Sequence, residues 1–317
     1  MSPVPQSSVP VTQSEPLRGG LSGSGVTKHM IYMNGAASAV CLVEKRLPLR
    51  ARSLPEYEIC RSIFEQAQLG VTYRSLPTII SATCQGTHYS VIMPYYVGIN
   101  AMMEDEEAHA RLIARAVVDF NRATLDFTRN DKFELLQRRL REFAAEGAGA
   151  ALAALKQEIL ELSGSPLPEA MGHPLVQSHN DVFFPNLATQ HYDRQHGIIL
   201  VDFGLAGLNA VGADFHHFVK AAVTGKLSEG FLDTLFAEYA ALTGVPETVL
   251  RLNAHEYALL RQFARMKKLC APHRAEQLAV EMAAAGRLLE GARTQRRRLA
   301  GGEDRADPRP QDSRRTA

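Results

Sequence analysis

The chain has 317 residues, and its 35 lysine and arginine residues nearly balance its 34 aspartate and glutamate residues. This near-neutral charge, with 45% hydrophobic residues, is typical of a globular protein and gives no sign of a nucleic-acid partner. No apolar run reaches the roughly 18 residues that a membrane span needs. The N-terminus lacks a signal-peptide pattern, and the four scattered cysteines favour reduced thiols. We therefore expect a cytoplasmic protein without a membrane span.

The N-terminal part of the sequence predicts a β-rich unit with one helix. Residues 1–15 are rich in Pro and Ser and predict a disordered tail. In the N-terminal lobe that follows, residues 16–97, Asn34-Gly35 indicates a hairpin. We expect its strands at residues 26–33 and 39–45, a helix at 53–69 capped by Ser53, and further strands at 78–84 and 89–93.

The pattern becomes mainly helical in the C-terminal lobe, residues 98–299. Short strands are expected at residues 176–178 and 198–202, and residues 300–317 predict a second disordered tail. The expected helices cover residues 104–127, 133–145, 150–162, 214–223, 230–242, 249–270 and 274–299. The fold class is therefore α+β, with a small β-rich lobe before a larger helical lobe.

The sequence SHNDVFFPN at residues 178–186, followed by IILVDFG at 198–204, is the most informative stretch. A loop leaves a short strand with Asp181 and presents Asn186 five residues later. An apolar strand then ends at Asp202. We expect these three side chains to converge at one end of a hairpin.

Phosphoryl transfer needs this set of groups. Its transition state carries charge on phosphate oxygens, so catalysis depends on positioning and on cations such as Mg²⁺. Mg²⁺ prefers hard oxygen ligands, and Asp202 and Asn186 would supply them. Asp181 would orient a hydroxyl and take its proton late. His179 would hold the loop by hydrogen bonding rather than by titrating.

The pattern His179, Asp181, Asn186 and then Asp202 resembles the aminoglycoside phosphotransferase and choline kinase-like family. That family has the two-lobed, protein-kinase-like fold. The resemblance implies Asp181 as catalytic base, and Asn186 with Asp202 as magnesium ligands. It also implies that Asp214, in Gly-Ala-Asp-Phe, braces the catalytic loop.

One departure from the family concerns the helix after the hinge. This helix often carries a Leu-His pair in the family, whereas the present sequence has Asp119-Phe120-Asn121. The departure affects the expected local packing rather than the chemistry.

The N-terminal lobe agrees with this resemblance. Glycines let backbone amides approach phosphates closely, and a glycine-rich loop precedes the first strand. From this loop we expect nucleotide contacts by Gly20, Gly23, Ser24 and Gly25. Lys45, at the end of the return strand, would hold the α- and β-phosphates.

A glutamate on the following helix would pair with Lys45. We choose Glu58, with Glu56 as the alternative. Residues 89–98 resemble the hinge that binds the adenine edge, which gives Met93 and Tyr95 as further nucleotide contacts.

These features together predict an ATP-dependent kinase, using ATP or another nucleoside triphosphate with Mg²⁺, that acts on a hydroxyl of a small polar molecule. Aminoglycosides, choline, ethanolamine and sugars are all candidate acceptors. The acidic stretch at residues 104–107 reads mainly as a solvated helix N-terminus, and an acidic rim for a cationic acceptor is the alternative. His216 and His217 read mainly as packed or surface side chains, and one of them facing the cleft is the alternative. The alternatives are a pseudokinase that binds nucleotide without turnover and an adenylyl transferase. The sequence leaves the oligomeric state open.

Overall fold

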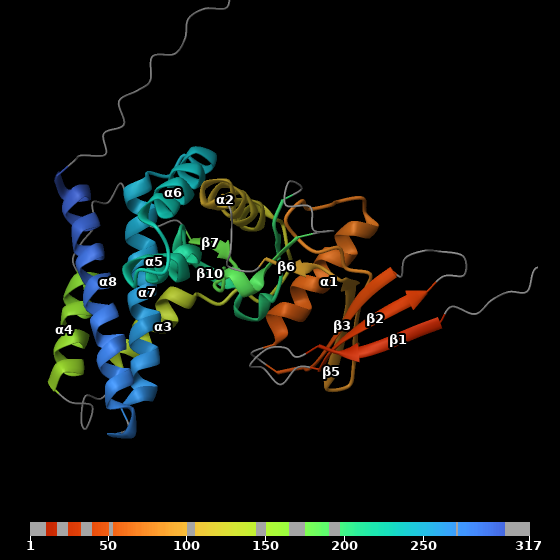
Figure 1. The fold of residues 1–317 in the computed structure, drawn as a ribbon, viewed down its shortest axis with the longest axis horizontal. Coiled ribbons are helices and arrows are strands. Elements are labelled where there is room, and N and C mark those ends of the chain that lie inside the picture. The colour runs from red at the N-terminus through yellow and green to blue at the C-terminus, as the bar shows by residue number, and fades with distance from the viewer. Residues whose placement is uncertain are drawn as a thin grey trace, which may run out of the picture.

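The structure is a computed structural model, and it describes residues 11–17, 25–32, 40–50, 53–99, 105–143, 150–164, 175–189, 197–270 and 272–301. A β-sheet with one helix forms the N-terminal part, and the remaining helices gather on the other side (Figure 1). The predicted α+β division into two lobes is confirmed.

The N-terminal sheet has five antiparallel strands in the order β1-β2-β3-β5-β4. The strands are β1 (Val11–Pro16), β2 (Gly25–Tyr32), β3 (Val40–Pro48), β4 (Ser81–Gln85) and β5 (His88–Pro94). The expected tail is corrected for residues 11–15, because β1 pairs with β2 along its whole length. Residues 1–10 of that tail lie outside the described residues. The Asn34-Gly35 turn lies outside the described residues.

Helix α1 (Leu54–Gln68) packs beside β4 and β5. Ile59, Cys60 and Ile63 are buried on its inner face, at the spacing expected for an amphipathic helix. Ser53 is the N-cap residue of α1, as predicted, but its side chain does not cap the helix. Its hydroxyl donates to the carbonyl oxygen of Pro48 at 2.6 Å and forms no cap bond to the helix.

The helical lobe is built around two long helices that pack along each other, α7 and α8. α7 is the more central one, with most of its side chains buried. The helices are α2 (Glu106–Arg122), α3 (Lys132–Arg141), α4 (Ala150–Gly164), α5 (His216–Val223), α6 (Glu229–Thr243), α7 (Glu247–Met266) and α8 (Ala275–Gly301). None of the helices in the described ranges is long and apolar enough to cross a bilayer.

Short strands lie between the sheet and the helices. Those of one small sheet are β6 (Val97–Gly98), β8 (Leu187–Thr189) and β9 (Ile199–Leu200), in the order β6-β8-β9. A second pair joins β7 (Leu175–Ser178) to β10 (Gly207–Ala210). Only β7 and β9 fall in segments predicted as strands. The strands β6, β8 and β10 lie outside the segments that the sequence predicted as strands.

Candidate active site

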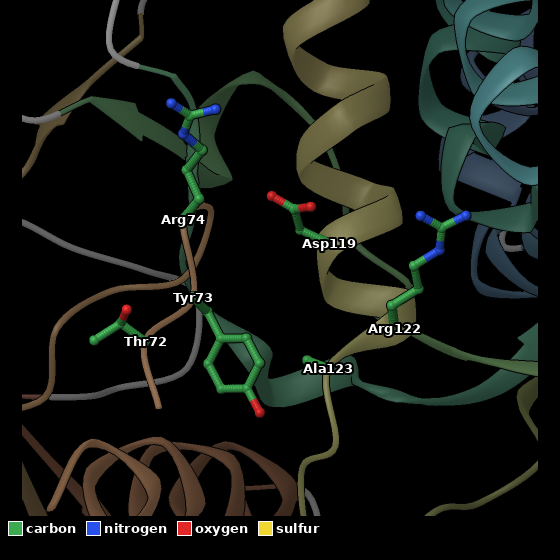
Figure 2. A pocket seen from close by; sticks show the side chains of 6 residues that line it. All are labelled: Thr72, Tyr73, Arg74, Asp119, Arg122 and Ala123. Atoms are coloured by element: carbon green, nitrogen blue, oxygen red, sulfur yellow. The ribbon is translucent and has the colours of Figure 1, made fainter. Parts of the chain in front are cut away.

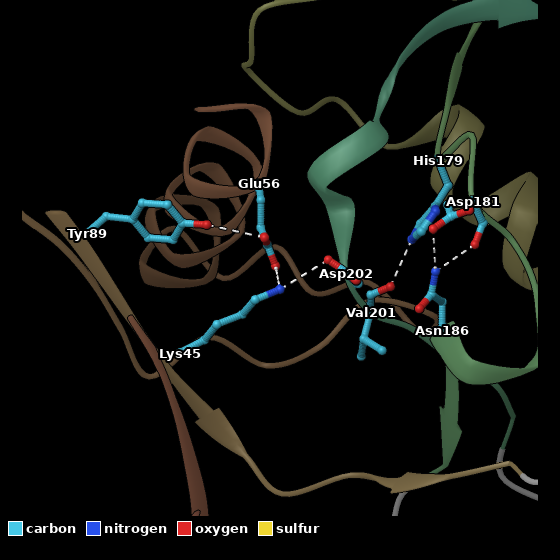
Figure 3. A network of polar contacts seen from close by, with 8 residues as sticks. All are labelled: Lys45, Glu56, Tyr89, His179, Asp181, Asn186, Val201 and Asp202. Atoms are coloured by element: carbon cyan, nitrogen blue, oxygen red, sulfur yellow. Dashed lines mark hydrogen bonds and ion pairs between the residues drawn. The ribbon is translucent and has the colours of Figure 1, made fainter. Parts of the chain in front are cut away.

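The loop after β7 brings Asp181 and Asn186 together. Asn186 ends a short 3₁₀ turn, Phe184–Asn186, that folds the chain back toward the loop. Its side-chain Nδ2 donates to the carbonyl oxygen of Asp181 at 2.8 Å and to the Asp181 Oδ2 at 3.0 Å (Figure 3). The five-residue spacing therefore produces a direct contact, as the sequence predicted.

Asp202 enters the same region through the pairing of β8 with β9. Leu187 lies opposite Leu200 in this pair, and the Val201 N–H donates to the Asn186 carbonyl at 3.1 Å. Asp202 is the next residue, and its side chain is about half exposed, at 49%. The hairpin thus places Asp202 just beyond the backbone of Asn186.

Two residues of this region adopt positive φ angles although they are not glycine. They are Asn180, at 62°, and Asp202, at 67°, and no other non-glycine residue in the described ranges does so. Asn and Asp tolerate the left-handed region better than most residues do. The strain is therefore concentrated beside Asp181 and at Asp202, as is common at functional sites.

Lys45 connects the N-terminal sheet to this loop region. Its Nζ lies 2.6 Å from Glu56 Oε1 and 3.0 Å from Asp202 Oδ1 (Figure 3). Burial acts to lower the pKa of Lys45, but the two carboxylates outweigh it and raise the pKa. The site therefore holds a permanently charged ammonium beside Asp202.

The partner of Lys45 corrects the choice of Glu58. The Glu58 carboxylate instead accepts the Thr128 N–H at 2.7 Å and the Thr128 hydroxyl at 3.2 Å. Glu56, the alternative, is buried with Ile59 and Ile63. The spacings of three and seven residues put Glu56 on the apolar face of α1, so this signal was present in the sequence.

Asp214 holds the loop from behind. It is buried, and its Oδ1 accepts the Asn180 N–H at 2.6 Å. Its Oδ2 lies 3.4 Å from the side-chain nitrogen of Asn121, whose Oδ1 accepts the Tyr239 hydroxyl at 2.6 Å. Asn121 belongs to the stretch that departs from the family pattern, and it connects α2 and α6 to the bracing of the loop.

His179 is fully buried between Phe120 and Phe203. Its ring centroid lies 5.8 Å from that of Phe120 and 5.2 Å from that of Phe203, and these two phenyl rings stack at 5.6 Å. Its Nε2 donates to the Val201 carbonyl oxygen at 3.0 Å. His179 therefore ties the Asp181 loop to the strand that carries Asp202, in line with its predicted hydrogen-bonding role.

His217 contacts Asp181, although the sequence favoured a packed or surface position for it. Its Nε2 lies 2.9 Å from Asp181 Oδ1, and its ring packs at 5.3 Å against Phe183. The signal available was its position three residues after Asp214, at the start of the helix that braces the loop. The 3₁₀ turn Ala213–Phe215 directly precedes this helix, and its geometry determines which of the two histidines faces the loop.

The charge state of Asp181 follows from these neighbours. Partial burial acts to raise the pKa of Asp181, but the His217 hydrogen bond and charge, with smaller effects of His179 and Arg261, lower it. Asp181 is therefore ionised at neutral pH, with one oxygen toward Asn186 and the other toward His217.

The remaining predicted nucleotide contacts are only partly described. Gly20, Gly23 and Ser24 lie outside the described residues, whereas Gly25 opens β2. Met93 lies in β5 opposite Val43 of β3, and the Tyr95 N–H donates to the Cys41 carbonyl at 2.9 Å. Met93 and Tyr95 thus lie beside β3, the strand that carries Lys45. Their contacts with a nucleotide stay predictions.

A hollow of about 240 Å³ lies between the segment after α1 and the end of α2 (Figure 2). It is lined by residues of the segment after α1 and of the end of α2, which are Thr72, Tyr73, Arg74, Asp119, Arg122 and Ala123. None of the predicted site residues lines it. It is therefore separate from the polar network described above.

The donor set fits a magnesium ion shared with phosphates. No cluster of three or more His, Cys, Asp or Glu within the described ranges could enclose a metal, but Mg²⁺ at nucleotides needs only one or two protein carboxylates. Because the Asn186 amide nitrogen is committed to Asp181, its amide oxygen stays available as a ligand. Asp202 offers the carboxylate that Lys45 contacts.

Comparison with solved structures shows which proteins share this fold. The chain is similar to a microcompartment-associated aminopropanol kinase, with 15% identity, a TM-score of 0.57 and coverage of 92% of this chain and 93% of that one. A spectinomycin phosphotransferase in complex with ADP and spectinomycin has 10% identity and a TM-score of 0.56, covering 89% and 92%. A choline kinase from Streptococcus pneumoniae has 12% identity and a TM-score of 0.50, covering 86% and 94%.

These structures confirm the predicted protein-kinase-like fold. No functionally curated protein matches the chain. A sequence profile described as the phosphotransferase enzyme family matches residues 85–248, which is about half of the chain and contains Asp181, Asn186 and Asp202. The chain therefore belongs to the phosphotransferase enzyme family.

Proposed function

We propose that this phosphotransferase moves the γ-phosphoryl group of a magnesium-bound nucleoside triphosphate, with ATP as the first candidate, onto a hydroxyl of a small polar molecule. The observation that carries the proposal is one connected polar network. It consists of two side-chain pairs, Lys45 with Asp202 and Asn186 with Asp181. The bond from the Val201 N–H to the Asn186 carbonyl oxygen links the two pairs through the backbone. Phosphate-binding, metal-binding and proton-accepting groups are thereby held in adjacent positions.

The nucleotide side uses groups from both lobes. Lys45 would hold the α- and β-phosphates, while Glu56 keeps its ammonium in place at 2.6 Å. Gly20, Gly23, Ser24 and Gly25 would cover the phosphates, and Met93 with Tyr95 would border the base. Asn186 and Asp202 would hold the magnesium ion. When bound, the ion neutralises charge on the phosphate oxygens.

The acceptor side centres on Asp181. The acceptor oxygen forms a bond to the γ-phosphorus while the bond from this phosphorus to the β–γ bridging oxygen breaks, and the nucleoside diphosphate leaves. Asp181 orients the acceptor hydroxyl and takes its proton late in the step. Its lowered pKa suits this role, because an ionised carboxylate accepts a hydrogen bond from the hydroxyl throughout.

The acceptor candidates include aminoglycosides, choline or ethanolamine, and sugars. A pseudokinase is the alternative, and the presence of Lys45, Asp181, Asn186 and Asp202 in one network favours turnover instead. Adenylyl transfer would release pyrophosphate, whereas the proposed reaction releases the nucleoside diphosphate.

The test is nucleotide consumption with Mg²⁺ across a panel of hydroxyl compounds, with ADP and pyrophosphate measured separately. Asp202→Ala should abolish magnesium-dependent turnover. Asp181→Asn should lower kcat by at least about 100-fold, since general-base catalysis contributes on the order of 10² to 10⁴, while nucleotide still binds. Asp126→Asn, at an exposed aspartate, serves as control. Full activity of Asp202→Ala or Asp181→Asn would refute the assigned roles.

A further inference from the structure

Three basic side chains near the site lack an acidic partner. Lys132 and Arg139 lie on α3 and Arg261 lies on α7. None of the three forms a hydrogen bond or ion pair with any residue in the described ranges, although Lys132 and Arg261 are half-buried. Long basic side chains can bury their stems and keep the charged end in solvent, so these two half-buried cations are available to bind an anionic ligand.

Other arginines of the same helices show the contrast. Arg251 of α7 binds Asp233 at 2.6 Å. Arg265, one turn after Arg261, lies 3.0 Å from Glu281 of α8. The helical lobe therefore provides carboxylates for neighbouring arginines of α7 but none for Arg261.

The three cations lie together because α3 packs against α7 (Figure 1). Phe133, next to Lys132, stacks on Tyr257 with ring centroids 6.4 Å apart, and Tyr257 precedes Arg261 by one helical turn. Lys132 and Arg139 are seven residues apart and share a face of α3. Burial lowers the pKa of Lys132, and the charges of Arg139 and Arg261 lower it further.

Arg261 lies on the acceptor side of Asp181. Tyr257, one turn before it, packs edge-on against His216 with ring centroids 4.9 Å apart. His217, the next residue, contacts the Asp181 oxygen that faces away from Asn186. The positive charge of Arg261 reaches both Asp181 and His216, since it contributes to lowering the pKa of each.

The nucleotide side has its own cation. Lys45 is balanced by Glu56 and Asp202, which outweigh burial and raise its pKa. Arg261 has no part in that network. Lys45 and Arg261 therefore belong to separate sets of interactions: Lys45 pairs with two carboxylates, whereas the Arg261 charge acts on Asp181 and His216.

We propose that the acceptor carries an anionic group, a carboxylate or a phosphate, and that Arg261 binds this group with Lys132 beside it. This inference rests on the proposed function, because it names the class of hydroxyl compound that is phosphorylated. The guanidinium can bind a carboxylate or phosphate through two parallel hydrogen bonds. Arg139, which is exposed, lies at the outer end of the same face and adds long-range attraction.

The experiment compares acceptors that share a carbon skeleton and differ in charge. One series is glycerate, glycerol and 3-aminopropane-1,2-diol, and the second is gluconate, glucose and glucosamine. ADP release is measured for each. We expect kcat/KM to be highest for the acid of a series, by at least about tenfold, the range for one hydrogen bond to a charged group.

Substitutions of Arg261 then test whether this residue binds the anionic group of the acceptor. Arg261→Met should lower kcat/KM for the acid by about ten- to hundredfold, and Arg261→Lys should recover part of the loss. Arg265→Met is the matched control, one turn along the same helix. Its guanidinium is paired with Glu281, so we expect no loss of selectivity for the acid. Thermal unfolding of each variant checks that the chain is folded.

A binding measurement distinguishes an anionic acceptor from the nucleotide phosphates as the ligand of Arg261. Titration calorimetry with gluconate, and separately with ATP and Mg²⁺, compares the wild type with Arg261→Met. Loss of gluconate binding with nucleotide binding retained supports the inference. Equal loss of both would assign Arg261 to the nucleotide phosphates and overturn it.

Two further outcomes distinguish the inference from the proposed function. Turnover that favours the neutral or cationic acceptors, with Arg261→Met equal to Arg265→Met, overturns the inference and leaves the kinase assignment intact. Absence of both nucleotide binding and turnover refutes the proposed function. Absence of any Arg261-dependent anion binding overturns the inference even if no acceptor of the panel is phosphorylated.

Discussion

Lys45 and Glu56 form an ion pair of 2.6 Å, and Asp202 approaches the same ammonium from the other lobe at 3.0 Å. Glu56 is 11 residues from Lys45 along the chain and Asp202 is 157 residues from it. One ammonium therefore fixes α1, the sheet and the strand that leads into Asp202 relative to each other. Tyr89 completes the arrangement, since its hydroxyl donates to Glu56 Oε2 at 3.2 Å.

Glu56→Gln is expected to lower kcat/KM for the nucleotide by about 10- to 100-fold. The substitution removes one charge-assisted hydrogen bond, worth about 1.5–3 kcal/mol, from a buried pair. Lys45 is then drawn toward Asp202 alone and holds the phosphates less well. Steady-state kinetics with varied ATP would measure the effect.

Glu58→Gln is the control on the same helix. Glu58 contacts Thr128 and not Lys45. The kcat/KM of the Glu58→Gln variant should therefore stay within about twofold of the wild type, with a loss of folding stability of about 1 kcal/mol. Equal kinetic losses in Glu56→Gln and Glu58→Gln would contradict the assignment of the ion pair.

His217→Ala is expected to lower kcat about tenfold, the effect of one hydrogen bond to a charged group, without changing the KM for ATP. Without its 2.9 Å contact, Asp181 Oδ1 is no longer held in one orientation. His217→Gln should recover part of kcat, because its amide can donate to the same oxygen. A glutamine variant as impaired as the alanine variant would show that the Phe183 packing, not the hydrogen bond, is what matters.

Asn180→Ala should be less stable than Asn180→Gly, by about 0.5–1 kcal/mol. Both remove the 2.5 Å bond from Asn209 to the Asn180 side chain. Alanine also has to adopt φ near 62°, at a cost of about 1–2 kcal/mol. The extra entropy of glycine in the unfolded chain, about 0.5–1 kcal/mol, offsets only part of this difference. Urea unfolding of the two variants tests the order, and a more stable alanine variant would argue against backbone strain at this position.

Stability should fall as the pH drops below about 6.5, the usual histidine pKa. Burial lowers the pKa of His255 and, more strongly, that of His216, whose neighbours His217 and Arg261 lower it further. The unfolded chain therefore binds protons at these positions before the folded chain does. Their contribution is full above the unfolded pKa and is lost as the pH falls toward the folded pKa.

Melting temperatures from pH 8 to pH 5 would measure this loss. His255→Gln should flatten the profile, because one of the groups with a lowered pKa is removed. An unchanged slope in this variant would assign the pH dependence to other groups.

The sequence alone was sufficient for the division into two lobes and for the contact between Asp181 and Asn186. Both depend on short-range patterns: strand and helix periods, and a five-residue spacing inside one loop. Glu56 could also have been chosen from the sequence, because it lies three and seven residues before Ile59 and Ile63. Glu58 directly precedes Ile59 on the same helix, and this position favoured Glu58 over Glu56 in the prediction.

Other features were decided only by the tertiary structure. The strand β1 pairs with β2, although residues 12–16 are all exposed and show no apolar alternation. His217 contacts Asp181 although the two are 36 positions apart in the sequence. Asn121 contacts Asp214 although these two are 93 positions apart. The basic group at Lys132 and Arg261 requires the packing of α3 on α7. The local sequence determines which face of its helix or strand a side chain occupies. The partner of that side chain depends on how distant elements pack, and the helix and strand periods of the sequence do not predict this packing.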